Sequence, residues 1–430
     1  MSASNFPAAG LVGLQSRAGA ASGAMARPGR VLLITNQFPP NHGGSASVYA
    51  ALAQHGGGRV VVLTPSLDYR DGNEIAGWQA HDRTVRGAVR RVRLLRTLLT
   101  PAAQGLAARI RGWASDLVLR LVVLARVIVL LHRERIDAVC IGEVLASGWM
   151  VPVLRLFTRV PVAVYIHGEE ILTQDDYDPG HRRAARTMAA ADRVFVVSRF
   201  SRAAALRLLP GCNAAKLALI TNGVDTARFH PGAPDRALLA RYGLEDGFVF
   251  ITVSRLLEKK GVDTAILALA ALLPQHPDCR LLVVGTGPME TELRALAHRM
   301  GLTGRVVFAG HVADEELAAH YRLGEAFVLA NRTLPNGDTE GFGLVLLEAS
   351  ACGLPVIGGR DGGTGSAVID GATGLLVDAH KVEAVAAAMA RLRLNDAERR
   401  RMGRAGAAFA AQSGWQEKAR DFLALCLDAG

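Results

Sequence analysis

The sequence has few aromatic residues, few cysteines and no long uncharged apolar segment, and each shortage counts against a class of protein. Aromatic residues make up only 5% of the 430 residues, which leaves little material for the base-stacking surfaces of nucleic-acid binders. The five cysteines lie far apart without a C-x-x-C pair, so a disulfide framework and a cysteine metal site are disfavoured and a reducing compartment is favoured. A G-x-G-x-x-G dinucleotide fingerprint is also missing.

The composition otherwise describes a globular chain with a basic balance. Half of the residues are hydrophobic and a fifth are charged, so the chain can bury sizeable cores, and its length suggests two or three domains. The formal net charge is +10. Residues 83–135 contain twelve arginines and two acidic residues, so this segment alone carries as much net charge as the whole chain. Such a local Arg-rich and Leu-rich patch favours an anionic membrane surface over nucleic acid as the partner.

The most membrane-like stretch is 117–131, which is fifteen residues long and interrupted by Arg120 and Arg126. A spanning helix needs about 20 apolar residues, so we expect this stretch not to span a membrane. Two interpretations stay open. It is either a buried helix of the first domain or an interfacial helix, helped by Trp113 and two arginines just upstream. We expect the protein in the cytoplasm, with peripheral contact to the inner membrane face under the second interpretation.

Short apolar runs alternate with helical patterns along most of the chain. Runs of Val, Ile and Leu without polar alternation are typical of parallel strands that are covered on both faces. Helical patterns at 262–273 and 289–300 complete β-α-β units. The predicted strands are 30–38, 59–64, 137–142, 160–168, 192–198, 216–223, 247–255, 280–287, 305–310, 326–331, 354–359 and 374–378.

This alternation predicts an α/β protein with two doubly wound, Rossmann-like domains facing each other across a cleft. The Ala-, Gly- and Ser-rich residues 1–29 contain no apolar core of a signal peptide, so we expect a disordered tail. The first domain is predicted at 30–225, a linker at 226–246 and the second domain at 247–410. Residues 411–430 are expected to form a helix that packs back on the first domain.

The strongest functional signal is the segment TEGFGLVLLEASACGLPVI (339–357). Glu340 lies in a Gly-bearing loop and Glu348 eight residues later in a predicted helix, so their backbones are at most about 12 Å apart along the helix axis. This spacing suits two acceptors that grip the ends of one hydroxyl-rich ligand better than a glycosidase carboxylate pair. The backbone N–H groups of Phe342, Gly343 and Leu344 are expected to be free for a phosphate.

A second signal is VSRLLEKKG (253–261), where Arg255 and Lys260 flank the turn that follows a strand. Cations at this position can neutralise a diphosphate leaving group, although a solvated loop is the simpler interpretation of such a turn. Glu258 and Lys259 are predicted to face solvent.

Three further segments end predicted strands with residues of possible function. Gly43 and Gly44 follow the first strand, where glycine lets the backbone approach a ligand closely. The turn GTGP places Gly285 and Gly287 after another strand, and His167 follows the strand of IHGEEI. The D-x-D of residues 176–178 lies in an acidic loop rather than at a strand end, so no metal site is predicted there or elsewhere.

Taken in this order, these segments resemble the retaining glycosyltransferases of family 4, which have the GT-B fold. The resemblance covers about residues 30–378 and rests on the E-x7-E element with GFG and GLPVI, on R-x4-K, on ITNGVDTARFHP and on GTGP. HGEE looks most like the phosphatidylinositol mannosyltransferase branch and its bacterial polysaccharide relatives.

The resemblance implies a role for each matched residue. Glu340 holds the hydroxyls of the donor sugar, and Glu348 holds the ribose of the nucleotide. Arg255 and Lys260 bind the diphosphate as it leaves, and His167 lines the sugar or acceptor side. The backbones of the glycine turns and of residues 342–344 complete the donor site. These backbone contacts are expected from Gly43, Gly44, Gly285, Gly287, Phe342, Gly343 and Leu344.

The implied reaction is transfer of a hexose, with mannose favoured, from a GDP- or UDP-linked donor to a lipid-linked or saccharide acceptor. It proceeds with retention and without metal or cofactor, in the synthesis of glycolipids or cell-surface polysaccharides. The sequence departs from the family at 359–368, where Ser366 lies near the position of the usual acid of G-G-x-x-E. Rival interpretations are a nucleotide-sugar epimerase, a glycogen-type synthase and a non-catalytic nucleotide-sugar-binding protein. We expect no nucleic-acid partner.

Overall fold

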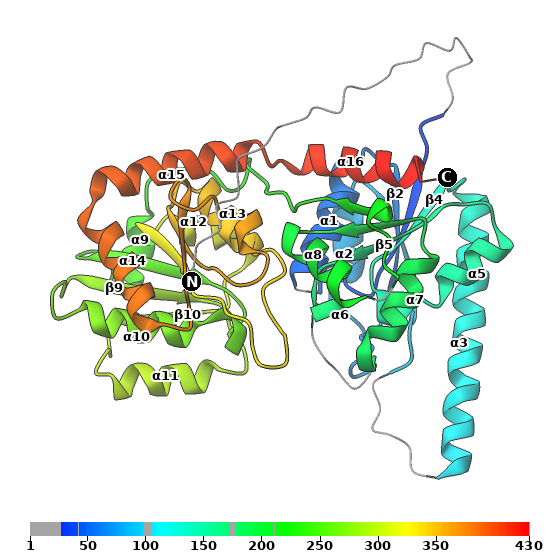
Figure 1. The fold of residues 1–430 in the computed structure, drawn as a ribbon, viewed down its shortest axis with the longest axis horizontal. Helices are drawn as coiled ribbons and strands as arrows, with labels where there is room; N and C mark the ends of the chain where they lie inside the picture. Colours follow the sequence, from blue (N-terminus) through cyan, green and yellow to red (C-terminus); the bar gives the residue numbers. More distant parts are fainter. Residues whose placement is uncertain (1–26, 42, 99–104, 173–177, 210, 430) are drawn as a thin grey trace.

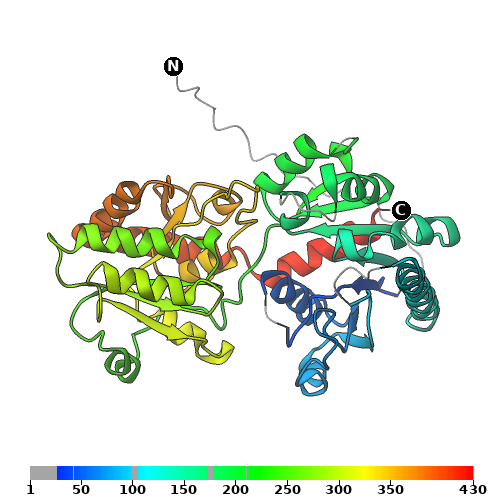
Figure 2. The same cartoon turned by 90° about the horizontal axis from the view of Figure 1, so that it is seen from below.

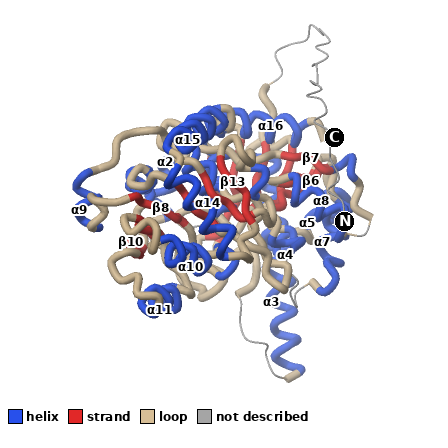
Figure 3. Tube along the Cα trace, turned by 60° about the vertical axis from the view of Figure 1, so that its left-hand side comes forward, coloured by secondary structure: helices blue, strands red, loops and turns tan. Residues whose placement is uncertain are grey.

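A computed structural model describes residues 27–429 except 42, 99–104, 173–177 and 210. Two α/β domains lie side by side, each built on one parallel sheet (Figure 1). The central strands are made of short Val-, Ile- and Leu-rich runs that are almost fully buried, as expected for sheets with helices on both faces. Figure 3 shows the strands in the interior and the helices around them. The expected tail of residues 1–29 falls largely outside the described residues.

The N-terminal sheet has the strand order β3-β2-β1-β4-β5-β6-β7. Every neighbouring pair in it is parallel, so each connection crosses over through a helix or a loop. The strands are β1 (Val31–Ile34), β2 (Val60–Pro65), β3 (Ala88–Val92), β4 (Ala138–Ile141), β5 (Val162–Ile166), β6 (Arg193–Val196) and β7 (Leu217–Leu219). The helices are α1 (Gly44–His55), α2 (Trp78–Thr84), α3 (Leu106–Arg133), α4 (Val144–Ser147), α5 (Met150–Phe157), α6 (Glu169–Leu172), α7 (Arg182–Ala190) and α8 (Arg199–Leu208).

The C-terminal sheet has the order β10-β9-β8-β11-β12-β13 and is also parallel throughout. Its strands are β8 (Phe248–Val253), β9 (Cys279–Val284), β10 (Val306–Gly310), β11 (Ala326–Leu329), β12 (Val356–Gly359) and β13 (Gly374–Val377). The helices of this half are α9 (Arg236–Tyr242), α10 (Val262–Leu272), α11 (Glu290–Arg299), α12 (Asp314–Tyr321), α13 (Leu344–Ala351), α14 (Val382–Leu394) and α15 (Asp396–Ala411). Helix α9 lies inside the range 226–246 that the sequence suggested as a linker.

Each predicted strand is present, and one strand was missed. The edge strand β3 has the sequence AVRRV, in which two arginines interrupt the apolar run. Both arginines pair with acidic residues, Arg90 with Glu134 and Arg91 with Asp82. An edge strand whose polar side chains are neutralised locally needs no apolar run, and its sequence therefore lacks the pattern of the central strands.

The last helix, α16 (Trp415–Leu427), crosses from the C-terminal half to the N-terminal domain (Figures 1 and 2). It packs against α1 and the strands β4 and β1. Phe422 is fully buried, with its ring centre 5.6 Å from that of Phe195 and 6.3 Å from that of Tyr165. Where the chain crosses back, the Val224 N–H donates to the Ser413 carbonyl, so two crossing segments join the domains side by side.

Helix α3 is longer than its sheet. Its 28 residues measure about 42 Å, whereas a six-residue strand measures about 20 Å. Its C-terminal end is fixed at the amino end of β1, because Glu134 accepts a hydrogen bond from the Arg30 guanidinium at 3.0 Å. The N-terminal half therefore extends past the carboxyl ends of the strands, and Figure 1 shows it projecting from the domain. One face of the C-terminal half of 117–131 is buried in the first domain, and its N-terminal half is exposed. Contact of the exposed half with a membrane stays a prediction.

Candidate active site

The carboxylate of Glu340 and the ammonium of Lys260 form a hydrogen-bonded ion pair. Lys260 ends the short 3₁₀ helix η3 (Glu258–Lys260) after β8, and Glu340 lies in the loop between β11 and α13. Their side chains are 16% and 12% exposed. Burial raises the pKa of Glu340, but the charge and hydrogen bond of Lys260 outweigh it, so the net pKa lies below its usual value. Glu340 is therefore a carboxylate at neutral pH.

Lys259 is not solvent-facing, and the prediction for this residue is wrong. Its side chain is only 6% exposed, and its ammonium lies 2.8 Å from a carboxylate oxygen of Asp338. The tight turn of η3 directs Lys259 under the loop that carries Asp338, and the carboxylate compensates the buried charge. The same prediction for Glu258 is confirmed, since its side chain is 59% exposed.

Arg255 lies just beyond the carboxyl end of β8 and is exposed. Its guanidinium makes no ion pair or hydrogen bond with another residue in the described part of the chain. It comes from the same β8–η3 turn as Lys260. A free cation thus lies five residues from a paired one, at the strand end where parallel α/β sheets bind ligands.

The N-terminus of α13 follows Glu340 directly. Gly343 precedes the helix with a φ of 86°, and Phe342 is buried. The Phe342 N–H donates to a Glu340 carboxylate oxygen at 3.4 Å, so the expectation that this group is free is wrong. The N–H groups of Gly343 and Leu344 make no hydrogen bond with any described residue, which leaves two donors at the helix start.

Glu348 lies on α13, and one of its carboxylate oxygens accepts a 2.7 Å hydrogen bond from the Tyr321 hydroxyl. Burial raises the pKa of Glu348, against the opposing effects of that hydrogen bond and of the Arg228 charge. Tyr321, on α12, is fully buried and packs edge-on against Phe229. Sequence reasoning missed Tyr321, because a lone Tyr in a helical pattern gives no functional signal. Arg228 belongs to the ITNGVDTARFHP segment that the sequence did single out.

Gly285 and Gly287 pack against the turn that carries Arg255. A Cβ atom at Gly285 would lie 2.0 Å from the Ser254 carbonyl oxygen, and one at Gly287 would lie 2.5 Å from that of Leu256. Neither position can hold a larger residue without moving the β8–η3 turn. The two glycines thus support the turn, and a direct donor contact stays a prediction.

His167 follows β5 in the N-terminal domain and is held between two aromatic rings. The Tyr165 ring stacks on it at 5.0 Å with an interplanar angle of 20°, and the Tyr49 ring meets it edge-on at 5.1 Å. The backbone N–H groups of His167 and Gly168 donate to the Glu170 carboxylate at 3.2 and 3.0 Å. The imidazole position is thereby fixed at the end of the strand.

The two domains touch at this point. A Cβ atom at Gly341, next to Glu340, would lie 2.1 Å from the His167 carbonyl oxygen. A Cβ atom at Gly44 would lie 3.8 Å from a methyl group of Leu344. The structure therefore brings His167 and the Gly43–Gly44 turn next to the Glu340 loop and the start of α13. We call this region the interdomain junction.

Ser366, at the point where the sequence departs from the family pattern, also lies at the interdomain junction. Its hydroxyl accepts a 3.2 Å hydrogen bond from the backbone N–H of Arg199, at the start of α8 in the other domain. The departure thus replaces an expected acid with a neutral group that links the two domains.

Glu143 is a buried carboxylate that sequence reasoning missed. It follows β4 and accepts hydrogen bonds from the Thr35 hydroxyl at 2.8 Å, the Asn36 backbone at 2.7 Å and the Gln37 backbone at 3.1 Å. Burial raises its pKa. These bonds hold the first residues of the segment that leads to Gly43. An acidic residue directly after a fully apolar strand was the available signal.

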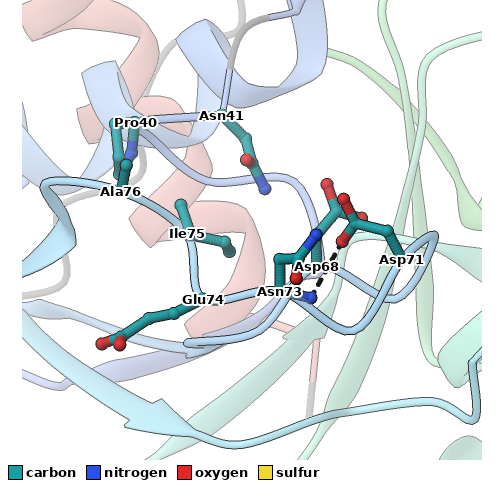
Figure 4. A pocket seen from close by; sticks show the side chains of 8 residues that line it. All are labelled: Pro40, Asn41, Asp68, Asp71, Asn73, Glu74, Ile75 and Ala76. Atoms are coloured by element: carbon teal, nitrogen blue, oxygen red, sulfur yellow. Dashed lines mark hydrogen bonds between the residues drawn. The ribbon is translucent and has the colours of Figure 1, made fainter.

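A polar pocket of about 350 Å³ lies beside the same segment (Figure 4). Asp68, Asp71 and Glu74 contribute carboxylates, and Asn41 and Asn73 contribute amides. Its carboxylates disfavour the diphosphate of a donor.

The described residues contain no group of three or more His, Cys, Asp or Glu side chains placed to hold a metal ion. Asp176 and Tyr177 of the D-x-D segment lie outside the described residues. Asp178 accepts hydrogen bonds from the backbone N–H groups of Arg183 at 2.7 Å and Ala184 at 2.9 Å, and so stabilises the first turn of α7.

Comparison with known proteins agrees with this geometry. The family described as Glycosyltransferase Family 4 matches residues 43–228, and Glycosyl transferases group 1 matches residues 237–409. The chain is 33% identical over 393 residues to a GDP-mannose-dependent alpha-(1-6)-phosphatidylinositol monomannoside mannosyltransferase of Mycolicibacterium smegmatis, covering 91% of this chain and 96% of the relative. The chain belongs to glycosyltransferase family 4. The predicted family is confirmed, and the protein is a glycosyltransferase that uses a nucleotide sugar.

Other relatives and solved structures extend this result. A D-inositol 3-phosphate glycosyltransferase of Acidothermus cellulolyticus is 36% identical over 304 residues, covering 67% of this chain and 64% of that relative. The crystal structure of Anabaena Alr3699/HepE in complex with UDP has a TM-score of 0.72 at 21% identity, covering 92% of this chain and 98% of that one. A sucrose-phosphate synthase from Thermosynechococcus elongatus has a TM-score of 0.69 at 23% identity, covering 92% and 97%. The predicted GT-B fold is confirmed.

Proposed function

We propose that this family 4 glycosyltransferase transfers mannose from GDP-mannose to an inositol-phosphate-containing, lipid-linked acceptor, with retention of the anomeric configuration. The observation that carries the proposal is the ion pair of Lys260 and Glu340 next to the free cation of Arg255. The cations of the C-terminal domain support a charged donor, and the polar groups of the N-terminal domain support a hydroxyl-rich acceptor. The choice of guanine and of mannose is supported by the names of the relatives.

The donor site follows from charge. Arg255 and Lys260 bind the diphosphate, and the N–H groups of Gly343 and Leu344 add two neutral donors at a helix N-terminus. Glu340 accepts hydrogen bonds from the sugar hydroxyls, and the second carboxylate oxygen of Glu348 accepts from the ribose. The glycine turn at Gly43 and Gly44 closes over the phosphates.

The chemistry requires stabilisation of a departing nucleoside diphosphate. Two protein cations aimed at its oxygens can supply this, since removal of one preorganised donor typically costs 10² to 10³ in rate. Transfer therefore proceeds in the presence of a chelator. We propose front-face transfer by the incoming hydroxyl as the course of the reaction.

The acceptor approaches from the N-terminal domain. His167 lies at the interdomain junction, and the carboxylates and amides of the pocket near Asn41 suit the hydroxyls of an inositol or sugar ring. The mannosyltransferase relatives act on a phosphatidylinositol monomannoside by name. The relatives named for D-inositol 3-phosphate share the inositol phosphate but no lipid, and they favour a soluble acceptor as the second candidate.

Peripheral membrane contact through 83–135 is part of the proposal. The described residues include no helix long and apolar enough to cross a membrane. However, Leu106, Ile110, Trp113, Leu117 and Leu121 of α3 are 57–81% exposed. At 100° per residue they share about 80° of the helix circumference, so they form one apolar stripe on the projecting half of α3. Arginines flank the stripe, which suits an anionic lipid surface.

Two experiments test the proposal. Thermal unfolding with GDP, UDP, ADP and their sugar conjugates in EDTA should give a selective rise in Tm with GDP and GDP-mannose, because a ligand at 100 times its Kd adds about 2.7 kcal/mol of stability. Labelled mannose should then pass to phosphatidylinositol monomannoside rather than to D-inositol 3-phosphate, and the product should be the α-anomer. A selective response to UDP, or a β-linked product, would overturn the donor or the stereochemistry respectively.

The membrane contact is tested by vesicle pelleting. The protein should sediment with anionic vesicles and not with neutral ones, and the variant Leu117→Glu should lose this binding. Ala107→Glu, on the same helix outside the stripe, is the control for added charge. Equal indifference of the protein to both vesicle types would end this part of the proposal.

A further inference from the structure

An apolar groove of about 760 Å³ lies beside the exposed stripe of α3. One wall is the end of β3 and the segment after it, with Val92 and Leu94, and the other is the face of α3 that carries Ala114, Val118 and Val122. Ala114, Val118 and Val122 are exposed, so the described part of the chain does not cover this wall. The volume falls within the range of about 300–1,000 Å³ that ligand sites have.

Three arginines line the groove, and Arg91 among them is paired with Asp82. Arg93 and Arg126 line it, and both are exposed. Their guanidinium groups make no ion pair or hydrogen bond with another described residue, in contrast to Arg90 and Arg91 of β3, which are paired. An apolar wall with unpaired cations at its rim is complementary to a molecule with a hydrocarbon chain and an anionic head.

The position of the groove relates it to the site. Its first wall follows β3, and so lies at the carboxyl ends of the strands, which is the edge that the interdomain junction also occupies. In the sheet order β3-β2-β1, β3 lies two strands from β1, or about 10 Å at 4.8 Å per strand. A head group held at Arg93 is therefore within a short distance of the segment that follows β1 and leads to Gly43.

We propose that this groove binds one acyl chain of an anionic lipid acceptor, with the lipid phosphate at Arg93 and Arg126. The inference rests on the proposed function and deepens it, because it makes the enzyme hold the acceptor's chain on the protein in addition to touching the membrane with the stripe. Burial of each methylene group is favourable, so the acyl chain supplies affinity that a soluble inositol phosphate lacks.

The test uses monomeric lipids below their critical micelle concentration. Calorimetric titration with palmitoyl lysophosphatidylglycerol should show one molecule bound per chain, at least tenfold tighter than palmitoyl lysophosphatidylcholine, and glycerol phosphate alone should not bind. The variant Ala114→Phe fills the groove at an exposed helix position and should weaken lysophosphatidylglycerol binding at least tenfold. Ala107→Phe, at an exposed position of α3 outside the groove lining, should bind as the unchanged protein does.

A double change of Arg93→Gln and Arg126→Gln should remove the preference for the anionic head while chain binding remains, and Arg133→Gln is its control. Unchanged lysolipid binding by Ala114→Phe would overturn the groove as the chain site. Absent lysolipid binding in a protein that sediments as a dimer would also overturn it, because the groove would then be an interface. Stabilisation of the unchanged protein by GDP and GDP-mannose is measured separately. If neither raises Tm, the proposed function fails, whatever the result of lysolipid binding.

Discussion

Lys260 and Glu340, eighty residues apart in the sequence, pair through a hydrogen bond at the carboxyl ends of two neighbouring strands of the C-terminal sheet. The parallel order β8-β11 brings the β8–η3 turn and the loop after β11 to one edge. The pair places a cation, proposed to bind phosphate, and an anion, proposed to bind sugar hydroxyls, a hydrogen bond apart. One ligand that carries both groups, a nucleotide sugar, can engage both side chains together.

Replacing Lys260 by methionine should slow transfer about 10²- to 10³-fold, because one preorganised cation is lost. It should also change the pH profile. The pKa of Glu340 is lowered in the folded protein, so its charged form and the pair's stabilisation persist at higher pH and are lost as pH falls through that folded pKa. Without Lys260, burial still raises the pKa of Glu340, and only the weaker effects of Lys259 and the Phe342 N–H oppose it. The acid limb of kcat should therefore move to higher pH.

A pH–rate series on purified protein measures this shift. Lys381→Met is the matched control, since Lys381 pairs with the exposed Asp378 at a remote surface position. An acid limb that stays in place in Lys260→Met would show that Glu340 does not control the activity.

Replacing each of the two glutamates of the E-x7-E element should affect a different step, nucleotide binding in one case and sugar transfer in the other. Glu348→Ala should weaken nucleotide binding, because the residue is assigned to the ribose, whereas Glu340→Ala should leave nucleotide affinity unchanged and abolish transfer. Calorimetry with GDP and a transfer assay with GDP-mannose measure the two effects. Normal transfer by Glu348→Ala would remove the ribose assignment, and loss of GDP binding in Glu340→Ala would remove the sugar assignment.

Much of this arrangement was predictable from the sequence, and the failures have physical causes. The central strands could be predicted because burial on both faces requires unbroken apolar runs. The E-x7-E and R-x4-K elements could be recognised because each carries several residue types at fixed spacing. Strand β3 was missed because neutralised arginines replace its apolar run. Lys259 was misassigned because its burial depends on Asp338, 79 residues away. Glu143 and Tyr321 act through partners on other elements, which no local pattern reports.

The buried pair of Lys259 and Asp338 should support the loop that leads to Glu340. Asp338→Ala leaves an ammonium that is 6% exposed without its carboxylate partner, which typically costs 3–5 kcal/mol. At 2–4 °C per kcal/mol for domains of this size, we expect Tm to fall by about 6–20 °C. Asp396→Ala, whose carboxylate is half exposed, is the surface control and should change Tm by less than about 2 °C.

Contact between the domains at Gly341 should be required for transfer and not for nucleotide binding. The backbone of Gly341 lies so close to the His167 carbonyl oxygen that an alanine Cβ would be 2.1 Å from it. No rotamer change relieves a clash between a Cβ atom and another domain's backbone, so Gly341→Ala must hold the domains apart locally. The contacts proposed for the nucleotide come mainly from Arg255, Lys260 and Glu348 of the C-terminal domain, and the N-terminal domain adds the glycine turn at Gly43 and Gly44. GDP should therefore bind Gly341→Ala with little loss of affinity while kcat falls at least 10²-fold.

Gly365→Ala provides the matched change, since its Cβ would have its nearest neighbour at 3.9 Å, an ordinary contact. This variant should keep both GDP binding and kcat. Small-angle scattering in the presence of GDP adds a readout of domain separation, and the Gly341→Ala protein should have the larger radius of gyration. If Gly341→Ala transferred mannose at the normal rate, the chemistry would not depend on the contact between the Glu340 loop and the end of β5. Glu340 and His167 would then act without the close approach that the interdomain junction shows.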